Sequence, residues 1–171
     1  MITESLPARS REKFSQSIEE TYKKYANMIF QVSFSYMKKA TDAEDIVADV
    51  FVKLIKRRAK FQKFQNEEHE KAWLLRTAIN LCKNNLKHWK RKSVNIDEYE
   101  NLPTENPFHI DDSFKAVMEL PERYKNVVYL YYYEGYATAE IARILKKPQS
   151  TVRVHLHEAR KILKGVLENE E

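Results

Sequence analysis

The chain has 171 residues, 43% of them hydrophobic and 32% charged, and a formal net charge of +5. This composition fits a soluble protein of one domain or two small ones, and no apolar run approaches the ~18 residues of a membrane span, so we expect no membrane insertion. The N-terminal stretch MITESLPARSREKF has no apolar core, and Cys82 is the single cysteine. We therefore expect no signal peptide, no disulfide framework and a cytoplasmic location.

Only two glycines and five prolines occur, which favours an all-α protein because few sharp turns are available. Apolar residues recur at spacings of three and four over residues 14–36 and again over residues 46–55, and each stripe predicts a helix. Thr41 with Glu44 three residues later predicts a capping box at the start of the second helix.

Residues 61–69, FQKFQNEEH, interrupt this periodicity and predict a loop. A third helix is predicted from about Glu70 to Trp89. Its inward residues are expected to be Trp73, Leu74, Ala78, Leu81, Cys82 and Leu86, whereas Trp89 is left undecided. Residues 10–92 are thus predicted to form one helical domain.

Residues 93–112 carry six acidic residues and no Lys or Arg, lack helical periodicity, and predict an acidic linker. Two basic blocks precede it, with six Lys or Arg in residues 50–66 and five in residues 83–92, neither containing an acid, and a third block follows it, with seven Lys or Arg in residues 143–164 against one acid, Glu158. Basic blocks on both sides of an acidic joint favour two modules that face a polyanion, although each block alone fits an ordinary solvated helix face equally well.

A second helical domain is predicted over residues 113–171, with short helices before Pro121 and before Gly135. Two amphipathic patterns follow, separated by a turn at Pro148, which a continuous helix would not tolerate. Gln149 or Ser150 is predicted to cap the last helix. If Val152, Leu156, Ala159 and Leu163 face inward, the outward face holds Ser150, Arg153, Val154, His157 and Lys161. Such a helix-turn-helix can enter a major groove, though many tight helical hairpins bind no DNA.

The stretch from Met118 to Leu163 resembles region 4 of sigma-70-class RNA polymerase sigma factors, especially the extracytoplasmic-function (ECF) group. The matching motifs, in order, are Leu120-Pro121, Tyr124-Lys125, Glu134-Gly135, Glu140-Ile141-Ala142, Thr151-Val152-Arg153 and Ala159-Arg160. The resemblance implies that this domain reads the promoter −35 element. Together with the outward face of the last helix it gives the −35 set Ser150, Thr151, Arg153, Val154, His157 and Lys161.

The first domain resembles region 2 of the same family, through DAEDIVADVFVKLIKR (42–57) and AWLLRTAINLCKNNLK (72–87). The first segment is similar to the helix that docks on the β′ clamp helices of the polymerase, which implies roles for Asp45, Asp49 and Lys53. The second is similar to the helix that engages the −10 element. The resulting −10 set is Phe61, Phe64, Arg76, Asn80, Lys83, Asn84 and Lys87, where either phenylalanine fits core packing as well as stacking on a base.

Several positions depart from the family's pattern. Lys146 stands where a glycine is usual and Lys147 where an apolar residue is usual, and a positive φ at Lys146 would cost on the order of 1 kcal/mol. Glu158 replaces a frequent basic residue, and Val154-His155 replace a small-basic pair. In the first domain, Ile79 and Asn84 replace a usual arginine and aspartate. These departures put the promoter preference in question rather than the architecture.

The resemblance implies a sigma factor that binds core polymerase through the β′ clamp helices and the β flap, and promoter DNA both duplex and melted. An anti-sigma partner is common in this group, and the sequence leaves open whether one exists here. Two other classes of protein are a free-standing dimeric helix-turn-helix regulator and an enzyme. No sustained heptad supports the first, and no metal-ligand or nucleophile motif supports the second, so we expect no catalytic activity, metal or cofactor.

Overall fold

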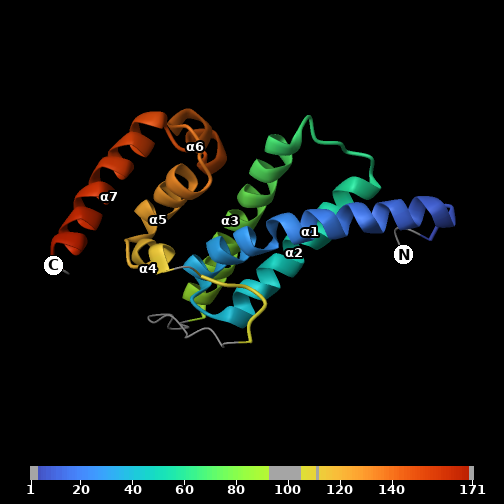
Figure 1. Ribbon diagram of the computed structural model, residues 1–171, viewed down its shortest axis with the longest axis horizontal. Coiled ribbons are helices and arrows are strands. Elements are labelled where there is room, and N and C mark those ends of the chain that lie inside the picture. Colours follow the sequence, from blue (N-terminus) through green and yellow to red (C-terminus); the bar gives the residue numbers. More distant parts are fainter. Residues whose placement is uncertain (1–3, 93–104, 111, 170–171) are drawn as a thin grey trace. The chain divides into compact units, whose positions relative to one another are not determined.

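The computed structural model describes residues 4–92, 105–110 and 112–169, and these form α-helices and one π-helix with no strand among them (Figure 1). The all-α prediction is therefore confirmed. The chain divides into two compact units, Met1–His109 and Ile110–Glu171.

The first unit is built from three long helices, α1 (Ala8–Met37), α2 (Ala40–Ala59) and α3 (Glu67–Arg91). The C-terminal half of α1 is apolar on almost every side and lies in the core, which is why its buried residues run nearly without a break from Tyr25 to Met37. Helices α2 and α3 pack against it. The largest fully buried side chains of this unit are Phe30, Phe34, Ile29, Met37, Ile46, Leu54, Leu74, Leu75 and Val32.

The predicted capping box at Thr41 and Glu44 is wrong. Helix α1 extends to Met37, so only Lys38 and Lys39 separate it from α2, and Thr41 already lies inside the first turn of α2. The cap residue Lys39 makes no side-chain capping bond, and its carbonyl accepts from the Ala43 amide at 3.0 Å.

Helix α3 begins three residues earlier than predicted. Asn66 is its N-cap, with Oδ1 accepting the His69 amide at 2.8 Å, so residues 67–69 are helical rather than part of the loop. Three of the residues expected inward, Trp73, Leu81 and Leu86, are only half-buried, and Trp89 is also half-buried. The buried face is completed by Leu75 and by Ile79, which is 3% exposed.

The second unit contains α4 (Asp112–Met118), α5 (Glu122–Val128), the π-helix η1 (Tyr129–Tyr133), α6 (Thr138–Leu145) and α7 (Gln149–Asn169). The π-helix is closed by the Glu134 amide, which donates to the Tyr129 carbonyl at 3.2 Å. Gly135 follows at φ 70°, a conformation that glycine adopts without strain. The core of this unit is Phe114, Val127, Leu130, Ile141, Val152, Leu156 and Ala159.

The turn between α6 and α7 uses a lysine where glycine is favoured. Lys146 has φ 53° and ψ 47°, and the Lys147 amide donates to the Ala142 carbonyl at 3.0 Å. This is the bonding pattern of a helix end closed by a left-handed residue. Lys146 thus has a positive φ, a conformation that a glycine would adopt without strain. Gln149 and Ser150 lie within α7 rather than before it, and the Gln149 side chain donates from Nε2 to Thr138 Oγ1 at 2.9 Å instead of capping α7.

Candidate nucleic-acid interface

The outward face of α7 carries the residues that the sequence singled out. Val152, Leu156 and Ala159 are at most 3% exposed and anchor the helix to its unit. Their burial fixes the rotation of the helix, so the opposite side is presented to solvent. On that side Ser150, Arg153, Val154, His157 and Lys161 are exposed, and Thr151 is half-buried at the edge.

Two features modify the charge of this face. Glu158, which replaces a common basic residue, forms an exposed ion pair with Lys161 at 3.3 Å, so part of that lysine's charge is neutralised. His155 turns away from the face, is half-buried, and meets the Tyr124 ring edge-on with centroids 5.5 Å apart. Burial, followed by the nearby Lys147 and Arg123 charges, lowers the pKa of His155, which therefore favours the neutral form.

Arg160 is a basic residue that the sequence-based site set omitted. Its Nε donates to the Tyr132 hydroxyl at 2.7 Å, and its guanidinium lies 5.6 and 5.8 Å from the ring centroids of Tyr131 and Tyr132. This contact joins η1 to α7. The Ala159-Arg160 motif was a signal for Arg160, but its aromatic partners depend on the π-helix, which periodicity does not reveal.

In the first unit, the end of α2 presents an aromatic side chain to solvent. Phe61 is 79% exposed and has φ 54°. Its amide donates to Arg58 O at 2.9 Å and the Gln62 amide donates to Arg57 O at 3.3 Å, which is the Schellman pattern that ends helices at a glycine. A phenylalanine here is therefore strained and leaves its ring in water.

The second phenylalanine of this loop has a different environment. Phe64 is half-buried, lies 5.5 Å from Trp73 and 5.4 Å from His69 between ring centroids, and has the Arg57 guanidinium 4.4 Å from its own centroid. The sequence could not distinguish the two phenylalanines, but the structure does, because Phe64 packs on α2 and α3 whereas the Phe61 ring is exposed.

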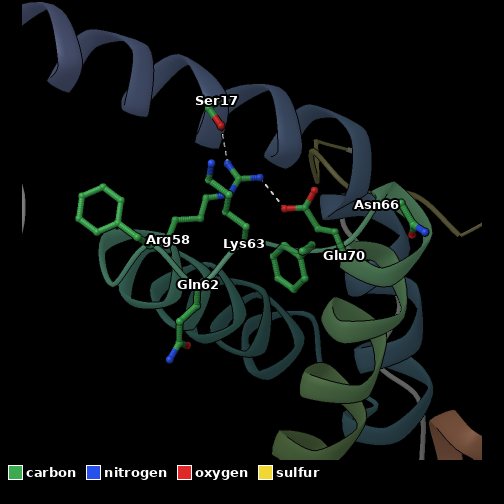
Figure 2. A pocket seen from close by; sticks show the side chains of 8 residues that line it. Ser17, Arg58, Gln62, Lys63, Asn66 and Glu70 are labelled. Atoms are coloured by element: carbon green, nitrogen blue, oxygen red, sulfur yellow. Dashed lines mark hydrogen bonds and ion pairs between the residues drawn. The ribbon is translucent and has the colours of Figure 1, made fainter.

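A pocket of about 380 Å³ opens beside this loop (Figure 2). Its lining consists of Ser17, Arg58, Phe61, Gln62, Lys63, Phe64, Asn66 and Glu70. Figure 2 shows the Arg58 guanidinium lying between Ser17 and Glu70. Arg58 donates to Ser17 Oγ at 2.6 Å, to Thr21 Oγ1 at 2.8 Å and to Glu70 Oε1, so one side chain of α2 ties α1 to α3 and holds the wall of the pocket.

The start of α3 is fixed to α1 by a second set of contacts. The Tyr25 hydroxyl donates to Glu67 Oε1 at 2.7 Å, and Lys24 pairs with the same carboxylate. The bond from Lys24, and then that from Tyr25, lowers the pKa of Glu67, while burial and the bond to Glu67 raise the pKa of Tyr25. The loop between α2 and α3 is therefore anchored at both ends.

The polar face of α3 continues from this loop. Asn80, Lys83, Asn84 and Lys87 are exposed along one side of the helix, whereas Arg76 is half-buried and its buried Nε has no hydrogen-bond partner among the described residues. Ile79 is in the core, so the residue that replaces the family's arginine cannot contact a ligand on this face. The described residues contain no cluster of three or more His, Cys, Asp or Glu that could hold a metal.

A separate surface lies on α2. Asp45, Asp49 and Lys53 are exposed there, and Val52 between them is 46% exposed. Beside this face is an apolar groove of about 640 Å³, which the sequence did not predict because its two walls come from different helices. Its lining consists of Arg11, Phe14, Ser15, Ile18, Glu19, Tyr22, Phe51 and Ile55.

Within the described ranges no helix is long and apolar enough to cross a bilayer.

Comparison with known protein sequences agrees with both regions. The family described as Sigma-70 region 2 matches residues 21–92, and the family described as Sigma-70, region 4 matches residues 115–163. RNA polymerase sigma factor SigV of Bacillus subtilis is 29% identical over 83% of this chain and 86% of its own length. The ECF RNA polymerase sigma-E factor of Haemophilus influenzae is 24% identical over 98% of this chain and 96% of its own length.

Solved structures share the fold. The sigma factor RpoE of Bartonella quintana, solved in complex with the anti-sigma factor NepR, superimposes with a TM-score of 0.71 at 20% identity, over 91% of this chain and 99% of its own. CnrH, solved in complex with the cytosolic domain of CnrY, gives a TM-score of 0.61 at 17% identity, over 92% of this chain and 91% of its own.

Proposed function

This chain belongs to the sigma-70 factors of the ECF group and recognises promoters for RNA polymerase. We propose that separate surfaces of the chain contact core polymerase, the −10 element and the −35 element. Sigma factors are initiation factors that bind core polymerase and promoter DNA, and they are not themselves the catalysts of RNA synthesis. In this proposal residues 10–92 dock on polymerase and engage the −10 element, residues 93–112 are the linker, and residues 113–171 bind the −35 element. The chain acts in the cytoplasm, where its polymerase works.

The observation that carries the −10 assignment is the state of Phe61. An exposed phenylalanine forgoes about 1.5–3 kcal/mol of burial, and its left-handed backbone costs about 1–2 kcal/mol more. The Phe61 ring makes no packing contact with the described residues of the first unit that would offset these two costs. A ring held out beside a basic loop and a pocket is what stacking on an unpaired base requires. Phe61 is therefore the base-stacking residue, Phe64 supports the loop, and the exposed residues of α3 contact the strand beyond it.

The −35 element is assigned to the exposed face of α7. Residues near the start of a recognition helix reach base edges, and those farther along reach phosphates. Ser150, Arg153 and Val154 are accordingly the base-reading residues and Lys161 a phosphate contact, weakened by Glu158. Arg153→Ala is expected to lower affinity for the preferred −35 duplex and to reduce discrimination between sequences. Equal affinity of wild type and variant for that duplex in the holoenzyme would refute this role.

The docking surface is assigned to the exposed face of α2. Asp45, Asp49 and Lys53 flank Val52, so a polar rim surrounds an apolar centre, which is the common anatomy of a protein interface. Asp49→Arg is expected to weaken binding to core polymerase in a pull-down, whereas Lys23→Glu, on the exposed side of α1, is a matched charge-reversal control. If both variants bound core polymerase as wild type does, the α2 assignment would be withdrawn.

An anti-sigma partner forms part of the same proposal. It is supported by the two structural neighbours, one solved with an anti-sigma factor and the other with the cytosolic domain of CnrY. A protein that covered the exposed face of α2 would exclude polymerase from that face. We expect such a protein and core polymerase to compete for this chain. We expect this competition to be lost in Asp49→Arg.

A further inference from the structure

A short segment after the acidic linker is bound to the surface of the first unit. The Asn106 side-chain amide donates to Glu44 Oε1 on α2 at 2.9 Å, and the His109 backbone amide donates to Asn27 Oδ1 on α1 at 3.0 Å. Gln31 Nε2 donates to the His109 carbonyl at 3.4 Å. These contacts join residues between 62 and 82 positions apart in the sequence, so they are tertiary contacts rather than local turns.

An aromatic ring closes this attachment. Phe108 stacks on Phe30 with ring centroids 4.6 Å apart and planes at 13°. Phe30 is fully buried and Phe108 is half-buried, so the Phe108 ring packs directly on a residue of the core. Asn106 Oδ1 also accepts the Phe108 amide at 2.8 Å, which fixes the turn that directs the ring inward. Figure 1 shows this segment, in yellow, beside the helices of the first unit.

The attachment changes the length of the connection between the two units. Between Arg91, where α3 ends, and Asp112, where α4 begins, there are 20 residues, which can extend to about 70 Å. When residues 106–109 are bound to the first unit, only Ile110 and Asp111 join them to α4, and the tether from His109 spans about 10 Å at most. One small contact thus decides how far apart the two units can move.

We propose that residues 106–109 are an intramolecular ligand of the first unit, held by Phe30, Asn27, Gln31 and Glu44, and that their binding shortens the tether between the two units. We name residues 106–109 the linker dock. Its existence rests on contacts within the first unit and not on the assignment of DNA contacts. Its release in the promoter complex rests on the proposed function, because the two units must then reach elements about two DNA turns apart, at about 34 Å a turn, and a longer tether lets them separate more freely.

Hydrogen exchange of the full-length chain tests the linker dock directly. The His109 amide is expected to exchange at least about tenfold more slowly in wild type than in Phe108→Ala, because the bound segment must open before it exchanges. Glu105→Gln, at an exposed neighbour that makes none of the dock contacts, is the matched control and is expected to exchange as wild type does. Equal rates in wild type and Phe108→Ala would overturn the proposal.

A second variant guards against loss of the local fold. Asn106→Ala removes the bonds to Glu44 and to the Phe108 amide and leaves both rings in place, so it is also expected to speed exchange at His109. Amides in the middle of α1 and α2 should keep wild-type exchange in both variants. Faster exchange throughout these helices, with no selective change at His109, would contradict a separable dock.

The tether is tested by the distance between the units. Cys82 is fully buried, so spin labels can be attached to cysteines introduced at the exposed positions Glu68 and Glu119. Phe108→Ala is expected to broaden the distance distribution and lengthen its mean, and identical distributions would exclude a mechanical role. On forming a promoter complex with core polymerase, the wild-type His109 amide should lose its protection, and retained protection would refute the release step while leaving the dock intact.

Discussion

The two units present their recognition surfaces in physically different ways. In the second unit the surface is the outer face of a regular helix, α7, whose rotation is fixed by three buried residues on its other side. In the first unit the central surface is an irregular loop with a strained, exposed Phe61, held between helices by Arg58. A regular helix presents side chains to the edges of paired bases, whereas a projecting ring suits a base that has left the stack.

The two surfaces are therefore stabilised by different interactions. The α7 face follows from amphipathicity and persists as long as the helix stays packed. The loop depends on a few long-range polar contacts and on strain, so single substitutions can alter it without unfolding the unit.

Removing Arg58 should damage the first unit most. Arg58→Met leaves Glu70 without its partner, and the pair is only 19% and 15% exposed, so we expect a loss of about 3 kcal/mol in unfolding free energy. Urea denaturation of the full chain measures it. Lys23→Met, which breaks the pair with Glu19 at 72% and 61% exposure, should leave the urea unfolding midpoint close to that of wild type, because solvent screens an exposed pair. Similar losses of stability in the two variants would contradict the role of Arg58 in joining α1 to α3.

The two phenylalanines of the loop should respond in opposite directions. Phe64→Ala removes a half-buried ring and is expected to destabilise the first unit by about 2 kcal/mol. Phe61→Gly removes an exposed ring from a left-handed position and should leave stability unchanged or raise it by up to about 1 kcal/mol, while lowering affinity of the holoenzyme for single-stranded −10 DNA by about tenfold or more. Destabilisation by Phe61→Gly would show that its ring is a packing residue.

Left-handed lysines offer a matched pair across the two units. Lys38 has φ 62° at the end of α1, and Lys146 has φ 53° at the end of α6. Glycine at either position should relieve strain and raise stability by about 0.5–1 kcal/mol, measured by thermal unfolding. Lys146→Gly should leave −35 discrimination intact because the α7 face does not move. A loss of discrimination would mean that Lys146 itself reads DNA.

The smallest effect concerns pH and the second unit. Burial lowers the pKa of His155 in the folded state, so the unfolded state binds more protons once the pH falls below about 6.5. Stability contributed by the neutral histidine is present above that pH and is lost as the pH falls, levelling off below the folded pKa. His155→Gln should flatten the stability profile between pH 7 and 5, measured by urea denaturation. Parallel profiles in wild type and His155→Gln would contradict the buried setting.

Helix periodicity predicted most of the fold, since apolar residues at spacings of three and four mark faces that must be buried. It predicted the rotation of α7. The left-handed backbone at Lys146 has no periodic signal, and only the glycine usual at that position in the family pointed to it. It did not reveal the start of α3, because Asn66 lies in a polar run where the cap has no periodic signal. The Thr41 capping box failed because the sequence does not state that α1 continues to Met37.

The remaining features depend on long-range geometry. Phe61 and Phe64 are alike in sequence, and only the end of α2 decides which one projects. The Arg58 tie joins three helices, and the linker dock joins residues that the sequence separates by 62 to 82 positions. Ile79 stands where the family usually has an arginine, but the packing of α3 places it in the core.

The division of labour between the two surfaces is tested most directly by permanganate footprinting of one promoter with three holoenzymes, carrying wild type, Phe61→Ala or Arg153→Ala. We predict that Phe61→Ala still binds the duplex but loses permanganate-reactive thymines at the −10 element, and that Arg153→Ala binds more weakly but opens the DNA it does bind. Wild-type opening by Phe61→Ala on DNA that it has bound would contradict a projecting ring as the residue that captures an unpaired base.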